Sequence, residues 1–549
     1  MQPNKLKFYE NFIDILCDRN DTATQQLAST IPYIHFNRIK THYRTTIRNI
    51  DTVLKIMRSV DAYKLDELPS FIRELYDKEM HRRIDTKSLI DLGPTQDAGW
   101  RFKHQQLGLE LSKVNDRFGF FYDTRTGKTP MSLSIINDDI QRYPSHRWLI
   151  LCPLILIEEA WLADAHHFFP KLSVVSLHGK SKEERHKKFK VNANLYIQNI
   201  ESFITWQHEI EKLGIHGCFV DESSTMKSTT SKFGKAAVEF AQTMKKWYLL
   251  SGTPAPNGEH EYYRQLQSID LYGVHKSYAQ FKDHFFNNIS YNPQFEKLQI
   301  REDRKQEFVD LVKDYSLYVD KEDVLTTPGR EFIKVEMDMP KELNDKYKEL
   351  ARKLYIELDE DTTITASSAA AKMNKLNQVT SGFIIDTEEQ STHLLSRYRF
   401  EELLKLIVQH PNEQILIWAN YKEEFKQIQT LLGKSCAIVN GTVNIDEKRK
   451  NIKYFKEGKI QYLVANPASA DKGLTLTNAH ICIYFSMNHS YELFKQSMER
   501  IYGDIIKQPT KCLYYVMLAN NSIDQAIYTA VQNKGDVSAA VLSHLKGRI

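Results

Sequence analysis

The feature that most constrains the fold is a pair of segments in which short, almost uninterrupted apolar runs alternate with amphipathic stretches. A run without a polar face suits a strand of a parallel sheet that is covered by helices on both sides. The amphipathic stretches then supply the crossover helices, so the pattern predicts two α/β blocks. The runs are RWLILCP (147–153), LSVVSLHG (172–179), NLYIQN (194–199), GCFVDE (217–222) and WYLLSGTP (247–254) in the first block, and QILIWANY (414–421), SCAIVNG (435–441), IQYLVANP (460–467), AHICIYFS (479–486) and KCLYYVML (511–518) in the second.

The regions outside these blocks lack strand-like runs, and we expect them to be helical. Segment 35–58 combines spaced Lys and Arg with apolar residues, which predicts an amphipathic helix or a pair of helices. Its basic face could bind phosphates, but a solvated face of an accessory domain explains it more simply. The expected parts are a helical N-terminal accessory domain (1–98), a first α/β lobe (99–272), a helical insertion or linker (273–390) and a second α/β lobe (391–549).

Composition narrows the class of protein without revealing its function. The 549 residues suffice for two to four domains, and no apolar run reaches the 18 residues that would suggest a membrane span. The six cysteines are scattered and form no CxxC pair, which argues against a zinc site or a disulfide framework. We therefore expect an intracellular protein without a membrane partner. The net charge of +4 is too small to identify a nucleic-acid binder.

A candidate phosphate-binding loop lies in FGFFYDTRTGKTPMSL (118–133), where a predicted strand and a short loop precede a predicted helix. This arrangement points backbone amides at an anion. In such a loop Gly127 lets the backbone approach a phosphate, Lys128 reaches the β and γ oxygens, and the Thr129 hydroxyl can ligate Mg²⁺. The segment is therefore a candidate ATP site.

Two residues weaken this pattern when it is considered alone. Tyr122 and Arg125 occupy places where phosphate loops usually carry glycines, so chance is an equally good explanation. An acidic pair about 90 residues downstream favours function, because Asp221 and Glu222 end an apolar strand in GCFVDESS. A Mg²⁺–nucleotide site needs one carboxylate to hold the metal and a base to orient the attacking water.

A set of further motifs follows in order along the chain and resembles one family. The motifs are GWRFKHQQLGLEL (99–111), LILCPLILIEEAWLADAHHFFP (149–170), WYLLSGTPAPNGEHEYYRQLQSID (247–270), LNQVTSGF (376–383), ILIWANYKEEF (415–425), VNGTV (439–443), ANPASADKGLTLTNAHICIYFSMNHS (465–490) and YELFKQSMERIYGDIIKQ (491–508). Together they resemble the superfamily 2 helicase-like ATPases of the switch/sucrose-nonfermenting (SWI/SNF) type. The Arg-Thr-Gly-Lys-Thr form of the loop is similar to phage or prophage members.

This resemblance implies two RecA-like parallel-sheet lobes that use ATP and Mg²⁺ and act on DNA without sequence preference. It also implies a cytoplasmic location, in a bacterial or phage-infected cell. The residue roles that it implies are catalysis by Lys128, Glu222 and Arg500, nucleotide binding by Gln105, Arg125, Thr126, Gly127, Lys128 and Thr129, metal binding by Thr129 and Asp221, and coupling between ATP and DNA by Ser251, Thr253 and Gln496.

The sequence departs from the family pattern in its second lobe. Gly503 stands where the family usually has a second arginine, three residues after Arg500. Either Arg500 suffices, or another cation such as Lys507 substitutes, or hydrolysis is slow. Asp471 and Lys472 occupy places where glycines are common, so contacts with the DNA strand are expected to differ there.

The main hypothesis is an ATP-dependent motor that translocates on duplex DNA or remodels branched DNA. The alternatives are a strand-separating helicase and a weakly hydrolysing, ATP-dependent DNA-binding scaffold, which Gly503 and Asp471 favour. A viral packaging motor would need a nuclease domain, whereas the C-terminal half carries helicase-like motifs. A restriction-type translocase subunit stays open, although no nuclease or methyltransferase motif accompanies it. The basic run 180–190 could contact the DNA backbone, but a solvated helix is the simpler interpretation.

Overall fold

The computed structural model describes residues 6–8, 12–16, 35–37, 42–46, 53, 70–94, 97, 99–269, 277–289, 296, 298–360, 374–386, 391–469, 475–487, 490–503, 508–529 and 531–532. The described chain falls into two compact units, with the main division between residues 324 and 325. We call their parallel sheets, with the helices packed on them, the first and second lobes. Among the described residues, no helix combines the length and the apolar character needed to cross a bilayer.

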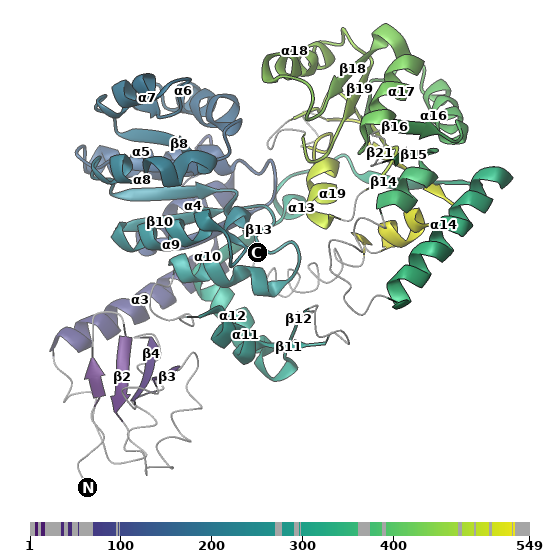
Figure 1. The fold of residues 1–549 in the computed structure, drawn as a ribbon. Helices are drawn as coiled ribbons and strands as arrows, with labels where there is room; N and C mark the ends of the chain where they lie inside the picture. The colour runs from purple at the N-terminus through teal and green to yellow at the C-terminus, as the bar shows by residue number, and fades with distance from the viewer. Residues whose placement is uncertain are drawn as a thin grey trace. The chain divides into compact units, whose positions relative to one another are not determined.

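The first lobe is built on a seven-stranded sheet in which every pair of neighbours is parallel (Figure 1). All the apolar runs predicted for the first block contribute strands to it. Because the strands are parallel, all their carboxyl ends lie at one edge of the sheet. In spatial order the strands are β13 (Ser316–Val319), β5 (Arg117–Tyr122), β10 (Lys246–Leu250), β9 (Gly217–Asp221), β6 (Trp148–Cys152), β8 (Leu195–Asn199) and β7 (Val174–Ser176).

Helices cover both faces of this sheet, as the continuous apolar strands require. In β6, Leu149 and Leu151 join the core on one face, whereas Trp148, Ile150 and Cys152 join the core on the other. One face packs against α8 (Phe203–Glu211), α9 (Lys232–Thr243), α10 (Tyr262–Ile269), α11 (Tyr278–Phe285) and α12 (Lys305–Tyr315). The other packs against α4 (Lys103–Val114), α5 (Lys128–Arg142), the π-helical turn η3 (Ile157–Leu162) and α6 (Ala163–Phe168). The short helix α7 (Lys182–Phe189) precedes β8.

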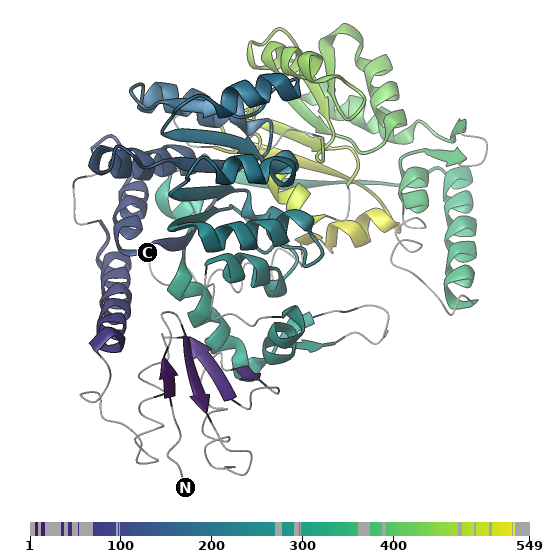
Figure 2. The same cartoon turned by 60° about the vertical axis from the view of Figure 1, so that its left-hand side comes forward.

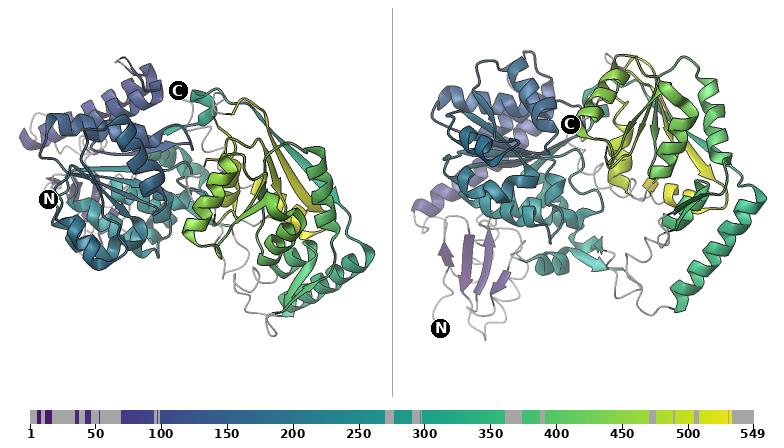
Figure 3. Two further views of the ribbon diagram at one scale, coloured as in Figure 1. Left: turned by 90° about the horizontal axis from the view of Figure 1, so that it is seen from above. Right: turned by 45° about the horizontal axis from the view of Figure 1, so that its top comes forward.

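The second lobe repeats this plan with a six-stranded parallel sheet (Figure 3). The predicted runs of the second block again form strands. Their spatial order is β14 (Arg330–Met337), β21 (Cys512–Ala519), β20 (Ile481–Tyr484), β17 (Ile415–Trp418), β19 (Tyr462–Ala465) and β18 (Cys436–Val439). One face packs against α16 (Tyr398–Gln409) and α17 (Lys422–Leu432), the other against α18 (Ile445–Lys456) and α19 (Tyr491–Met498). The prediction of two parallel-sheet lobes is therefore confirmed.

The prediction of an all-helical N-terminal domain is wrong. The described part of residues 1–98 contains a long helix, α3 (Ser70–Leu92), but also a four-stranded antiparallel sheet (Figure 2). Two of its strands lie in segment 35–58, which was predicted to be helical. Antiparallel strands are stabilised by partners that are distant in sequence, a contribution that helical spacing does not reveal. The strands are β1 (Leu6–Phe8), β2 (Phe12–Leu16), β3 (His35–Asn37) and β4 (His42–Thr46).

The region 273–390 is not simply a helical insertion, because it supplies one strand to each parallel sheet. β13 pairs with β5 in the first sheet, and β14 pairs with β21 in the second. Both are edge strands, and β14 (REFIKVEM) alternates charged and apolar residues, so it lacks the continuous apolar run used to identify strands. The region also contains the helices α13 (Lys321–Val324) and α14 (Lys341–Glu360). The strands β11 (Phe286–Asn288) and β12 (Leu298–Ile300) pair within it, whereas β15 (Phe383–Asp386) pairs with β16 (Ser391–Leu394), which lies just beyond residue 390.

Candidate functional site

The loop between β5 and α5 has the geometry of an anion cradle. It turns sharply, because Arg125 and Gly127 both have left-handed backbone conformations, with φ of 65° and 80°. The Thr126 hydroxyl closes the turn by donating to the carbonyl of Asp123 at 2.8 Å. Lys128 and Thr129 begin the 15-residue helix α5, so the loop lies at the amino terminus of a full-length helix. Backbone amides and the helix dipole favour an anion at this place.

Tyr122, which replaces a loop glycine, turns out to be the last residue of β5 and not part of the turn. Its ring is fully buried, and its hydroxyl donates to the carbonyl of His104 at 2.8 Å. The tyrosine thus joins the end of β5, where the loop begins, to α4. The turn itself keeps glycine at Gly127, where it is needed.

Gln105, on α4, braces the loop. Its Nε2 donates to the carbonyls of Thr126 at 3.3 Å and Gly127 at 3.1 Å, and its Oε1 accepts from the amide of Phe102 at 3.0 Å. A Cβ atom at position 127 would lie 2.0 Å from Nε2 of Gln105. Steric exclusion and positive φ therefore both demand glycine there. In this structure the Gln105 carboxamide contacts the loop backbone, and its predicted role in nucleotide binding stays a prediction.

Lys128 lies beside the carboxyl end of β5, where its Nζ donates to the carbonyls of Tyr122 at 2.9 Å and Asp123 at 3.1 Å. Thr129 follows in the first turn of α5 and is half-buried. Lys128, which is predicted to contact phosphate, and Thr129, which is predicted to bind the metal, are thus neighbours in the first turn of α5.

Asp221 ends β9, two strands from β5 at the same sheet edge. Its Oδ2 accepts from Nε1 of Trp161 at 3.0 Å, and its Oδ1 accepts from the amide of Glu222 at 3.0 Å. Burial, and next the negative charge of Glu222, raise the pKa of Asp221 to about 6, while Lys128 acts in the opposite direction. A buried carboxylate beside a second carboxylate is stabilised by a cation, so this pair of residues fits the Mg²⁺ ion that accompanies ATP.

Glu222 adopts a left-handed backbone conformation, with φ of 54°. For a residue with a Cβ atom this costs about 1–3 kcal/mol, and such strain concentrates at functional positions. The Thr225 hydroxyl and amide both donate to the Glu222 carbonyl at 2.9 Å, which holds the strained turn in place. The two acidic residues differ in exposure, because Asp221 is buried and Glu222 is half-buried.

The SGTP segment follows β10, the strand between β5 and β9. Ser251 is fully buried, and its Oγ accepts from the amide of Thr253 at 3.1 Å. A Cβ atom on Gly252 would lie 3.3 Å from the amide nitrogen of Thr124, so this segment packs directly on the phosphate loop. The predicted coupling residues of the first lobe are therefore adjacent to the predicted ATP site.

Two residues that the sequence did not single out connect these parts. The buried Gln265 on α10 accepts from the Ser223 hydroxyl at 2.7 Å and donates to the Pro254 carbonyl at 2.7 Å, so it joins the acidic turn to the SGTP segment. The buried Lys321, at the start of α13, donates to the Thr124 hydroxyl at 3.4 Å. A buried Gln or Lys gives no signal in the sequence until its tertiary contacts are known.

In the second lobe, Gln496 lies on α19 and Arg500 two residues after its end. Both are largely buried, and the Arg500 carbonyl accepts from the amide of Leu476 at 2.8 Å. Gly503 is also buried. Asp471, Lys472 and Lys507 lie outside the described residues. The catalytic role of Arg500 and the coupling role of Gln496 stay predictions.

Comparison with known proteins identifies two family domains. Residues 108–396 match the SNF2-related domain, and residues 398–502 match the helicase conserved C-terminal domain. The chain is 23% identical to protein p41 of Acyrthosiphon pisum secondary endosymbiont phage 1, over 68% of this chain and 82% of that protein. It is 21% identical to the Caenorhabditis elegans homologue of SWI/SNF-related matrix-associated actin-dependent regulator of chromatin subfamily A-like protein 1, over 95% of this chain and 73% of that protein.

Two further similarities are more distant. The DNA annealing helicase and endonuclease ZRANB3 of Mus musculus is 21% identical over 60% of this chain and 30% of its own length. The Sulfolobus solfataricus SWI2/SNF2 ATPase core, solved in complex with double-stranded DNA, aligns with a TM-score of 0.38 and 17% identity over 83% of this chain and 98% of that one. The SNF2-related domain alone matches more than half of the 549 residues. The chain therefore belongs to the SNF2-related family and is a helicase-like, nucleic-acid-dependent ATPase of superfamily 2.

Proposed function

We propose that the protein is a DNA motor that couples ATP hydrolysis to translocation on duplex DNA or to the remodelling of branched DNA. The observation that carries this proposal is the contact between the phosphate loop and the SGTP segment. Gly252 packs against Thr124, and Gln265 joins the SGTP segment to the acidic turn. A conformational change in the phosphate loop can therefore displace the SGTP segment through these contacts. The family resemblance assigns that segment to DNA coupling.

In this proposal the first lobe binds the phosphates of ATP through the loop amides and Lys128. Thr129 and Asp221 would hold Mg²⁺, which neutralises phosphate charge when bound. Glu222 orients the attacking water and accepts its proton, since its side chain is more exposed than that of the buried Asp221. Arg500 of the second lobe stabilises the charge that develops on the transferring phosphoryl group. Gln496 takes part in coupling, and Arg125 and Thr126 contribute to nucleotide binding.

DNA is the proposed polymer because relatives carry DNA activities in their names, such as DNA annealing helicase. The chain spans only 30% of that relative, so the finer substrate is inferred from the motor core alone. Contacts to the DNA backbone by Lys and Arg would give sequence-independent binding that weakens as salt increases. Action inside a bacterial or phage-infected cell is proposed because a phage protein is among the relatives.

The decisive experiment is ATP hydrolysis measured without nucleic acid and with single-stranded DNA, duplex DNA, forked DNA and RNA. We expect several-fold stimulation by duplex or forked DNA, and the Lys128→Ala variant should lose ATP binding and turnover on every polymer. Lys113→Ala, an exposed lysine in the last turn of α4, is the matched control. Absence of stimulation by any polymer would refute the motor proposal.

Triplex displacement and fluorescent unwinding assays then separate translocation from strand separation. Triplex displacement without unwinding supports translocation, whereas efficient unwinding of a fork supports a helicase. A second candidate, the weakly hydrolysing scaffold, is favoured by Gly503 at the place of the second arginine. It predicts ATP-dependent DNA binding with almost no turnover.

A further inference from the structure

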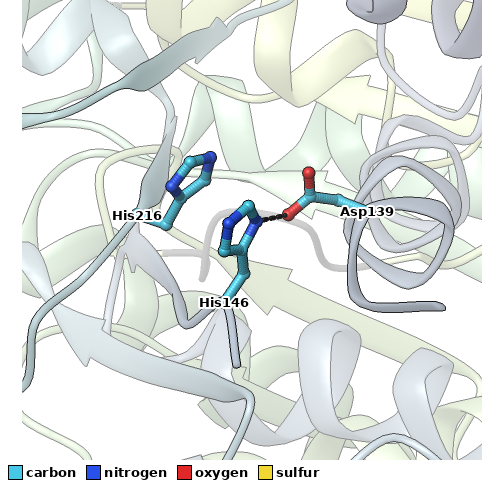
Figure 4. Close-up of side chains that lie close together, drawn as sticks. All are labelled: Asp139, His146 and His216. Carbon is cyan, nitrogen blue, oxygen red and sulfur yellow. Dashed lines mark hydrogen bonds and ion pairs between the residues drawn. The ribbon is translucent and has the colours of Figure 1, made fainter. Parts of the chain in front are cut away.

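Three polar side chains gather at the amino edge of the first sheet, opposite the phosphate loop (Figure 4). His146 and His216 directly precede β6 and β9, which are parallel neighbours with Trp148 paired to Gly217. Asp139 lies in the last turns of α5. The proposed ATP chemistry uses the other ends of α5 and β9, so this group of residues has no part in it.

The three side chains form a connected array. Nδ1 of His146 lies 2.9 Å from Oδ2 of Asp139, and the rings of His146 and His216 stack with their centroids 3.6 Å apart. Nε1 of Trp148 also donates to Oδ2 of Asp139, at 2.8 Å. Both of these bonds to the carboxylate use Oδ2. The array packs on the buried Trp148, and the His146 ring also stacks on the exposed Tyr143.

Nδ1 of His146 and Oδ2 of Asp139 are close enough to share one ion, which would replace the proton between them.

We propose that Asp139, His146 and His216 bind a transition-metal ion of the Zn²⁺ class. One ligand atom from each residue lies within 4.8 Å of the others. Ligands around a tetrahedral Zn²⁺ are about 3.3 Å apart, given metal–ligand distances of about 2.0–2.1 Å. A rotation of the half-buried His216 ring out of the stack closes this difference, and water completes the coordination.

Ligand type separates this site from the proposed Mg²⁺ site at the opposite edge. Imidazole nitrogen suits Zn²⁺, Co²⁺, Ni²⁺ and Cu²⁺, whereas Mg²⁺ prefers oxygen ligands and retains its waters. His146 has a side-chain exposure of 24%, so an ion can enter from solvent, while Asp139, at 9%, supplies a shielded negative charge. The absence of a CxxC pair therefore does not exclude zinc, because the proposed ligands are two histidines and an aspartate from distant segments.

A bound ion would connect the end of α5 to the starts of β6 and β9. The opposite ends of α5 and β9 carry Lys128 and Asp221. The ion would thus stabilise the layer of the first lobe on which the ATP site is built, and the melting temperature should increase as the free Zn²⁺ concentration rises above the dissociation constant.

The test is calorimetric titration of the metal-stripped full chain with Zn²⁺, together with the absorption spectrum of the Co²⁺ complex. We expect one tight equivalent, a tetrahedral Co²⁺ spectrum, and a higher melting temperature with Zn²⁺ that excess Mg²⁺ does not reproduce. His146→Ala and His216→Ala should each weaken binding by about tenfold or more. Asp139→Asn should also weaken it, while keeping an acceptor for Trp148.

His208→Ala, which removes an exposed histidine from α8, is the matched control and should bind as the wild type does. Circular dichroism of each variant reports whether it folds, and the Co²⁺ spectrum of the wild type tests the site independently of any variant. Equal Zn²⁺ affinity in the wild type and the His146→Ala/His216→Ala double variant would overturn the proposal. So would loss of the tight equivalent in His208→Ala, or failure of the wild type to bind one equivalent. None of these measurements depends on ATPase activity, so they fail or succeed independently of the proposed function.

Discussion

At the scale of single residues, the buried carboxyl group of Asp221 lowers the free energy of unfolding near neutral pH. Its folded-state pKa of about 6 exceeds the ordinary value of 3.8, so the folded protein keeps a proton that the unfolded chain releases. The free energy of unfolding therefore decreases as the pH rises from about 4 to about 6, and the loss persists above that window. At about 1.4 kcal/mol per pKa unit, the loss approaches 3 kcal/mol.

Asp221→Asn should consequently raise the melting temperature at pH 7 in the absence of nucleotide and metal, because the amide has no charge to bury. The gain should disappear below about pH 4, where the wild-type carboxyl is protonated in both states. Thermal unfolding at both pH values checks this, with Asp138→Asn, a half-buried aspartate on α5 that pairs with Arg142, as the control. A variant less stable than the wild type at pH 7 would show that the carboxylate stabilises the fold.

Glu222→Gln should separate ATP binding from ATP hydrolysis. The amide preserves the size of the side chain in its left-handed turn, but it cannot accept the proton of the attacking water. Binding of a fluorescent ATP analogue should stay within a few-fold of the wild type, while single-turnover hydrolysis falls below detection. If hydrolysis persisted, the general base would be another residue.

Some residues of the candidate site could be predicted from the sequence and others could not. Gly127, Lys128 and the acidic pair were predictable because their chemistry depends on local spacing. The supporting role of Tyr122 was not, because it depends on a hydrogen bond to the backbone of α4. The role of Gln265 could not be predicted for the same reason, since its partners Ser223 and Pro254 lie in separate segments that only the fold brings together.

At the scale of elements, the contact between loops explains how ATP and DNA would communicate. Gln265→Ala should leave ATP binding and basal hydrolysis close to wild-type values, because the side chain contacts neither the phosphate loop nor α5 in the bonds described. It should reduce stimulation by DNA several-fold, because the acidic turn and the SGTP segment lose their shared partner. The ratio of stimulated to basal turnover is the readout.

Gln267→Ala, two residues away on α10, is the control for that experiment, because Gln267 bonds only to Arg264 and Tyr263 of the same helix among the described contacts. Equal DNA stimulation in Gln265→Ala and Gln267→Ala would assign Gln265 a purely structural role. A fall in ATP affinity alone would place its effect on the nucleotide site and not on coupling.

Elements also differ in how well the sequence predicts them. Interior strands were identified because burial on both faces demands continuous apolar residues. The edge strand β14 was missed because it has one neighbouring strand and tolerates charged residues. The strands β1–β4 were missed because the pairing of β2 with β4, which joins the two local pairs into one sheet, is nonlocal. Helical spacing of the apolar residues in segment 35–58 was the more visible signal.

At the scale of the whole molecule, the proposed mechanism takes a cation from the second lobe for turnover. Arg500→Ala should lower the maximal rate of ATP hydrolysis far more than ATP affinity, since the guanidinium acts on charge that develops in the transition state. Related arginines contribute about 10³–10⁵ in rate. The exposed Lys511→Ala in the same lobe is the control. A silent Arg500→Ala variant would refute the assignment of this motif.

Gly503→Arg extends that test. If hydrolysis is slow because the second arginine is missing, the substitution should increase turnover. If Arg500 suffices, turnover should stay unchanged. Since Gly503 is buried, circular dichroism must first show that the larger side chain is accommodated.

The brace formed by Gln105 has a consequence for chemical genetics. Analogue-sensitive enzymes are made by trimming a side chain beside the base, so that an enlarged nucleotide fits only the altered protein. Gln105, which is predicted to bind the nucleotide, also holds the backbone of Thr126 and Gly127 through its Nε2. If Gln105 lies beside the base, trimming its side chain would also loosen the phosphate loop. An orthogonal ATP for the proposed motor should therefore be modified on the ribose, and the pocket should be enlarged elsewhere.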